Sequence, residues 1–200
     1  MNISGLILSG GMSSRMAGNP KALCRFSDEF NFLDRIIHVM TDAGLKDITV
    51  VTGCHDTEIK EHAAKNINNG ISYLYNSGWR SGMLSSIKFF MKSIDLSIKD
   101  GFIMVPVDHP FVESSTYLKI LEKCNKKHII IPKFADLKGH PVFWGNEFFE
   151  QLLNADLNIG ARQVSRTNKD KIIFVNTQDS GILKDIDTVD EYKKNFKCPE

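Results

Sequence analysis

The sequence predicts an α/β protein with three layers, α/β/α, in which helices cover both faces of a mostly parallel sheet. Two observations carry this prediction. Short apolar segments alternate with segments of helical periodicity along most of the chain, which is typical of parallel βαβ units. The segment GFIMVP, residues 101–106, is almost continuously apolar, as expected for a strand that is buried on both faces.

The first half of the chain contains three strands that alternate with three helices. Apolar residues at helical spacing predict the first helix, and Gly44 ends it. β-branched residues before Gly53 predict the second strand. The expected elements are a strand over residues 3–8, a Gly/Ser/Met-rich turn over 9–20, a helix over 32–43, a strand over 47–52, a polar helix over 56–66, a strand over 71–75 and a helix over 81–95.

The second half continues this alternation as far as Lys138 and then departs from it. The expected elements are the buried strand from residue 101, a helix over 114–124, a strand over 128–132, short helices over 147–153 and 159–166, a strand over 172–176 and a helix from about residue 189. We interpret the whole chain, residues 1–200, as one domain, in which residues 138–180 form a covering subregion on one side of the site.

Composition excludes several classes of function. Lys and Arg number 25 and Asp and Glu number 24, so the net charge is +1, without the basic excess of a nucleic-acid-binding protein. No apolar stretch approaches the roughly 20 residues of a membrane helix, and the first residues do not resemble a secretory signal. The four cysteines are far apart in the sequence, as in a reduced protein. We therefore expect a cytoplasmic protein with no membrane or nucleic-acid partner.

The first turn, LSGGMSSRMAGNPK, has the composition of a phosphate-binding loop. Gly10 and Gly11 allow the backbone to approach an anion closely, so that successive N–H groups can point at phosphate oxygens. Arg15 adds a fork of donors and Lys21 a mobile charge. The segment is neither a GxGxxG turn nor a GK[ST] loop. The same residues also fit an ordinary glycine-rich connection with cations at the surface.

Two acidic positions could hold a metal ion. Asp108 follows the buried strand, on the side of the sheet where the first turn lies, and Mg²⁺ binds one or two carboxylates together with water and substrate phosphates. Asp187 precedes Thr188 and Glu191, which form a capping-box pattern and predict a helix start. Both acids also have a purely structural interpretation, since acidic residues are favourable in loops and at helix N-termini.

Five segments together resemble the MobA/MocA-like nucleotidyltransferases, which act in molybdenum-cofactor maturation. They are LSGGMSSRMAGNPK, NSGWRSGMLSSIK, VDHP, GHPVFW and DIDTVDEY, in this order over nearly the whole chain. The resemblance implies a Rossmann-like fold of the nucleotide-diphospho-sugar transferase type. It also implies Mg²⁺-dependent transfer of CMP or GMP from CTP or GTP to a phosphate-bearing acceptor, with release of pyrophosphate. The acceptor implied is a pterin such as molybdopterin, and a molybdoenzyme is an implied partner.

The resemblance also implies a role for each matched residue. Arg15, Lys21 and Asp108 would be catalytic, and Asp108 and Asp187 would hold Mg²⁺. Gly139, His140 and Pro141 would contact the acceptor. The nucleotide would be bound by Leu8, Ser9, Gly10, Gly11, Ser13, Ser14, Arg15, Lys21, Asn76, Gly82, Ser85 and Ser86.

The sequence departs from the family pattern at Ala17, where the family usually has glycine. Gly10 is similar to the guanylyltransferase branch, whereas the SS, GHP and DIDT segments are similar to the cytidylyltransferase branch, so both CTP and GTP stay open. Two other functions also stay open. One is the same transfer to a sugar or alditol phosphate, and the other is a non-catalytic carrier that binds a nucleotide or cofactor.

Overall fold

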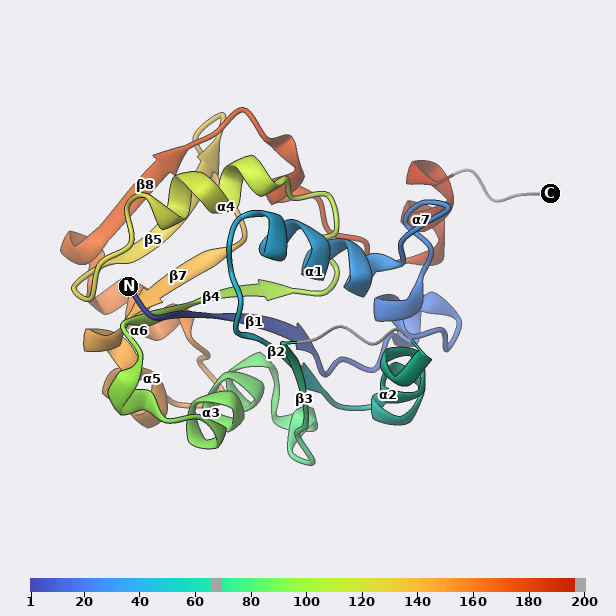
Figure 1. Ribbon diagram of the computed structural model, residues 1–200, viewed down its shortest axis with the longest axis horizontal. Coiled ribbons are helices and arrows are strands. Elements are labelled where there is room, and N and C mark those ends of the chain that lie inside the picture. Colours follow the sequence, from blue (N-terminus) through green and yellow to red (C-terminus); the bar gives the residue numbers. More distant parts are fainter. Residues whose placement is uncertain (66–69, 197–200) are drawn as a thin grey trace.

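The computed structural model of the chain describes residues 1–65 and 70–196. Eight strands of this part form one mixed sheet, and seven α-helices surround it (Figure 1). The strands are β1 (Ile3–Ser9), β2 (Ile48–Thr52), β3 (Ile71–Tyr75), β4 (Gly101–Pro106), β5 (Ile129–Phe134), β6 (Leu137–Lys138), β7 (Val142–Gly145) and β8 (Ile172–Asn176). The helices are α1 (Phe32–Asp42), α2 (Asp56–Lys65), α3 (Met83–Ser93), α4 (Ser114–Leu121), α5 (Phe149–Asn154), α6 (Arg162–Thr167) and α7 (Val189–Asn195).

The order of strands in the sheet is β3-β2-β1-β4-β7-β5-β6, and β8 pairs with β5. Neighbouring strands are parallel from β3 to β4, and β5 and β8 are also parallel. Strands β6 and β7 run in the opposite direction. Strand order reverses at β1, because β2 and β3 lie on one side of it and β4 lies on the other. The carboxyl ends of β1 and β4 at such a reversal are where α/β proteins bind ligands.

Each face of the sheet carries its own hydrophobic core. Side chains alternate along a strand, so Leu6 and Leu8 of β1 face one core and Ile7 faces the other. Helices α1 and α4 cover the face of Ile7, whereas α3, α5 and α6 cover the opposite face (Figure 1). Burial on both faces explains why β1 and β4 are apolar throughout. The predicted three-layer fold is confirmed.

The main difference from the expectation concerns residues 138–180. These residues were expected to form a covering subregion, but they also supply strands β7 and β8 to the main sheet. Strand β7 lies inside the sheet, between β4 and β5. The last predicted position of the polar helix, Asn66, lies outside the described residues. Among the described residues, no helix combines the length and the apolar character needed to cross a membrane.

Candidate active site

The loop after β1 is fixed by its own backbone. Ser13 and Ala17 adopt left-handed conformations, with φ of 50° and 52°, on either side of the 3-10 turn η1 (Ser14–Met16). The N–H of Lys21 donates to the Ser13 hydroxyl at 3.1 Å, and the Met16 side chain is buried in a small core with Phe32. Ala17 adopts its left-handed conformation without the freedom of a glycine. The loop thereby holds Arg15 and Lys21 beside the end of β1.

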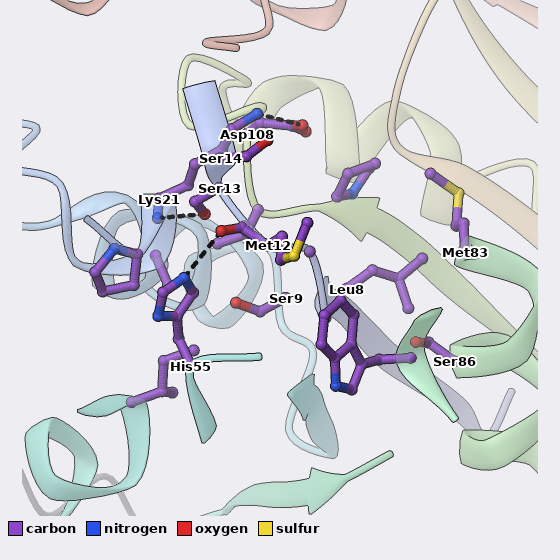
Figure 2. Close-up of a pocket in the computed structure, with 18 of the residues that line it drawn as sticks. Leu8, Ser9, Met12, Ser13, Ser14, Lys21, His55, Met83, Ser86 and Asp108 are labelled. Atoms are coloured by element: carbon purple, nitrogen blue, oxygen red, sulfur yellow. Dashed lines mark hydrogen bonds and ion pairs between the residues drawn. The ribbon is translucent and has the colours of Figure 1, made fainter. Parts of the chain in front are cut away.

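The loop after β2 packs closely on this first loop. A Cβ on Gly53 would lie 2.4 Å from the Gly10 carbonyl oxygen, so only glycine fits there. The N–H of Cys54 donates to the same oxygen at 3.3 Å. His55 points at the first loop (Figure 2), with its Nε2 3.2 Å from the Met12 carbonyl oxygen. The shape of the first loop therefore depends on residues that follow a different strand.

Two carboxylates meet beside Lys21. Asp108 lies just beyond β4, and its carbonyl accepts a hydrogen bond from the N–H of Ile186 at 3.0 Å, which brings Asp187 alongside. Lys21 Nζ lies 2.5 Å from Asp187 Oδ1 and 3.4 Å from Asp108 Oδ2. Arg15 donates to Asp187 Oδ2 at 2.8 Å. The hydrogen bond from Lys21 is the main reason why the pKa of Asp187 is lowered.

Asp187 is oriented by the start of the last helix. Thr188 caps α7 by accepting from the N–H of Glu191, and the Glu191 carboxylate accepts from the N–H groups of Asp187 and Thr188. The predicted capping box is confirmed. Ile186, between the two aspartates Asp185 and Asp187, is buried against Met16 and Phe32. Cap and core together hold the Asp187 carboxylate toward Lys21.

These groups surround a cavity of about 340 Å³ at the ends of β1 and β4 (Figure 2). Ten of the twelve residues predicted to bind a nucleotide line it, as do Asp108 and Asp187. Asn76 and Ser85 do not line it. Asn76 is buried, and its amide donates to the hydroxyls of Ser85 and Ser86 at 3.0 and 3.1 Å, so it supports the wall from behind. The structure thus brings the predicted first loop and the two predicted carboxylates to one place.

A second cavity, of about 960 Å³, adjoins the first, because Met83 lines both. Gly139 and His140, which were predicted to contact the acceptor, line it, whereas Pro141 is not among its lining residues. Burial lowers the pKa of His140 to about 3 and also lowers that of His109, whose ring centroid lies 4.8 Å away. Both imidazoles are therefore neutral near pH 7, and they line the second cavity as polar but uncharged groups.

The sequence matches the profile of the MobA-like NTP transferase domain over residues 5–172. This match covers most of the chain. The chain belongs to the MobA-like NTP transferase family. Among curated proteins, no significant sequence match was found. The resemblance recognised in the five sequence segments is therefore confirmed at the level of the family.

Solved structures similar to this MobA-like chain share its fold. Rv0371c from Mycobacterium tuberculosis is 20% identical, with a TM-score of 0.82 over 100% of both chains. Its complex with manganese aligns with 18% identity and a TM-score of 0.73, again over 100% of both chains. A nucleotidyl transferase from Methanothermobacter is 18% identical, with a TM-score of 0.79 over 96% of this chain and 95% of its own. A 4-diphosphocytidyl-2C-methyl-D-erythritol synthase from Anaerococcus prevotii is 16% identical, with a TM-score of 0.72 over 97% and 94%.

The donor set of this MobA-like chain fits a divalent ion such as Mg²⁺. Asp108 and Asp187 supply hard carboxylate oxygens, and the Lys21 ammonium between them shows that a cation is accommodated there. Asp108 Oδ1 is buried and accepts no hydrogen bond from the described residues. That oxygen therefore keeps its lone pairs available for a metal ion.

Several lining residues of the nucleotide cavity were missed by sequence reasoning. His55, Ile59, Trp79 and Met83 line it, yet they come from the loops and helices that follow β2 and β3. Cys54, His55 and, seven residues later, His62 have a metal-like spacing, but polar residues often gather by chance after a strand, so the sequence predicts no site there. The only local signal is position, because His55 comes soon after a predicted strand end.

Proposed function

We propose that the protein is a Mg²⁺-dependent nucleotidyltransferase that moves CMP or GMP from CTP or GTP to a phosphate-bearing acceptor. The observation that carries the proposal is the contact of one ammonium, Lys21 Nζ, with both Asp108 and Asp187 inside the cavity formed by the first loop. Cations and paired carboxylates beside a glycine-rich loop are what a triphosphate and its metal ion need. Family membership supports the same class of reaction.

The chemical step forms one P–O bond and breaks another. An oxygen of the acceptor phosphate attacks the α-phosphorus of the nucleotide. The bond from that phosphorus to the bridging oxygen of the β-phosphate breaks, and pyrophosphate leaves with the electron pair. Because a phosphate acceptor is already ionised near neutral pH, no general base is required. The protein has to position the two phosphates and neutralise charge.

We propose a role for each of these groups. The amides of Gly10–Ser13 and the guanidinium of Arg15 bind the β- and γ-phosphates, and Lys21 neutralises charge that develops at the α-phosphate. Lys21 suits this role because its side chain is only 13% exposed, and a charge shielded from water acts more strongly. Asp108 and Asp187 would hold Mg²⁺, which supplies Lewis-acid stabilisation of the phosphate oxygens.

For the acceptor we propose a pterin phosphate of the molybdopterin class, bound in the second cavity beside Gly139 and His140. The GHPVFW segment, which carries these residues, supports this choice over a sugar or alditol phosphate. The Anaerococcus relative, named for a diphosphocytidyl-methylerythritol product, supports the alternative. A molybdoenzyme that receives the product would then be the downstream partner.

The test measures pyrophosphate released by the purified protein with MgCl₂, each of CTP, GTP, ATP and UTP, and a panel of acceptors. The panel contains molybdopterin, an alditol phosphate and a sugar phosphate. We expect release with CTP or GTP and molybdopterin, and none when EDTA replaces MgCl₂. Release with only the sugar or alditol phosphate would overturn the pterin assignment. If no pair releases pyrophosphate while CTP or GTP still raises the melting temperature, the protein is a carrier and not an enzyme.

A further inference from the structure

The second cavity carries an unusual concentration of positive charge. Lys138 of β6, Arg162 and Arg166 of α6, and Lys169 after α6 all line it. Among the described residues that line it, Asp185 is the only acid. Arg162 and Arg166 are four residues apart on one helix, so their side chains are neighbours and repel each other. In isolation this arrangement is unfavourable.

None of these four cations forms an ion pair within the described part of the chain, although many other lysines do. Lys99 pairs with Asp47 at 2.5 Å, Lys126 with Asp100 at 2.9 Å and Lys171 with Glu147 at 3.4 Å. Lys138 instead lies over the Phe174 ring, 4.6 Å from its centroid. The donors of the four side chains are therefore free to bind an anion from outside the protein.

The same cavity also has an apolar wall. Met83, Leu157, Ile159 and Phe174 line it, and each is at least 40% exposed. A cluster of exposed apolar side chains in one cavity indicates a binding site more often than isolated exposed apolar side chains do. Trp144, also in the lining, is buried, and its indole N–H has no hydrogen-bond partner among the described residues, so the fold leaves a donor unused. Cations and apolar surface thus occur together beside the nucleotide cavity.

We propose that the acceptor carries two anionic groups on one apolar body. The reacting phosphate lies near His109, at the end of the cavity that adjoins the nucleotide site. The second anionic group binds Arg162 and Arg166, with Lys138 and Lys169 beside them, and the apolar body covers Ile159 and Phe174. This inference rests on the proposed function, because it extends the description of the acceptor in that reaction.

A small molecule fits these observations better than a macromolecule does. The cations line a cavity that adjoins the nucleotide site, since Met83 lines both. Its volume of about 960 Å³ is within the range of small-ligand pockets. Met83, one of the four apolar residues, lies where the two cavities adjoin, so we expect an occupant that extends from the nucleotide site to the cations to contact the apolar wall. The order of contacts, from phosphate to apolar body to second anion, follows from that path.

The test uses alkanediol bisphosphates of four, six and eight carbons, each compared with the alkyl monophosphate of the same length. Dissociation constants are measured by calorimetry without nucleotide. We expect at least one bisphosphate to bind about tenfold tighter than its monophosphate, because charge-assisted hydrogen bonds contribute that much. In Arg162→Gln/Arg166→Gln the preference should fall to about twofold or less. Lys92→Gln/Lys123→Gln removes two exposed charges outside the cavity and should keep the preference.

The variant Lys138→Gln/Lys169→Gln is a second test of the site if the arginine variant does not fold. We expect it to weaken in part the preference for the bisphosphate over the monophosphate. Equal binding of both members at all three lengths in the wild-type protein overturns the proposal, and so does an unchanged preference in both cavity variants. The pyrophosphate assay tests the proposed function separately from the anion site. A bisphosphate preference without any nucleotidyl transfer supports the anion site and refutes the proposed function. Nucleotidyl transfer without the bisphosphate preference supports the proposed function and refutes the anion site.

Discussion

Lys21 and Asp187 are 166 residues apart in the sequence, yet Lys21 Nζ lies 2.5 Å from Asp187 Oδ1. The contact joins the loop after β1 to the segment before α7, and the Lys21 ammonium also reaches Asp108. The first loop, the end of β4 and the last helix therefore meet at a single cation. We expect removal of that cation to lower the turnover but to leave the fold intact.

We expect Lys21→Met to lower the rate of pyrophosphate release about 100- to 1000-fold, because it removes a positioned charge that neutralises the transition state. The far-ultraviolet circular dichroism spectrum should stay that of the wild-type protein, since the packing of Ala22 and Leu33 is untouched. Lys92→Met, at an exposed position of α3, is the matched control. A turnover within twofold of wild type in Lys21→Met would remove this residue from the mechanism.

Asp185 and Asp187 provide a matched pair for the metal site, since only Asp187 lines the nucleotide cavity, whereas Asp185 lines the second one. We expect Asp187→Asn to raise the Mg²⁺ concentration for half-maximal activity about tenfold or more. Asp185→Asn should leave this concentration unchanged and alter only the KM for the acceptor. Titrations of activity with MgCl₂ distinguish them, and an equal shift in both variants would contradict the assignment of Asp187 to the metal.

Gly53 tests how the second loop supports the first. In Gly53→Ala the new Cβ meets the Gly10 carbonyl oxygen and Cα at 2.4 and 2.7 Å, and both are backbone atoms that cannot rotate away. We expect a loss of about 1–3 kcal/mol in the free energy of unfolding, together with weaker binding of CTP or GTP. Gly11→Ala is the stability control, because its Cβ would meet no atom within 4 Å. Urea unfolding measures both, and equal stability of the two variants would refute the close contact.

His140 predicts a pH dependence of stability. Its folded-state pKa is about 3 because of burial, whereas a histidine in an unfolded chain titrates near 6.5. Between these values the unfolded state binds a proton that the folded state does not, so the stability present above pH 6.5 is lost as the pH falls. We expect a loss of about 1 kcal/mol per pH unit from this residue between pH 6 and 4.5. Urea unfolding at pH 6 and pH 4.5 measures this loss of stability in the wild-type protein and in His140→Asn. An equal loss in both proteins would contradict the contribution of His140.

Local patterns made much of this structure predictable. The apolar run of β4 is buried on both faces, and Thr188 and Glu191 form the predicted capping box. Strand β7 was not predicted, because its antiparallel pairing with β4 joins residues about 40 positions apart (for example Ile103 and Phe143), and nothing within GHPVFW specifies that partner. The same reason applies to His55, whose contact with Met12 spans 43 residues. The place of Asp108 was predictable because it follows β4, and strand ends in a parallel sheet lie on one edge. Asp187 follows no strand directly but precedes the cap of α7, so only the resemblance of DIDTVDEY to the family segment indicated its place.

The short segment from Asp185 to Asp187 contributes one carboxylate to each of the two cavities, with buried Ile186 as its anchor. A deletion or insertion of one residue here would bring a carboxylate to the place where Ile186 is buried, or turn one carboxylate away from its cavity, even if every side chain were retained. The spacing of these three residues is therefore as much a part of the chemistry as their identity. Homologous chains that vary in length near their carboxyl end should do so outside this tripeptide.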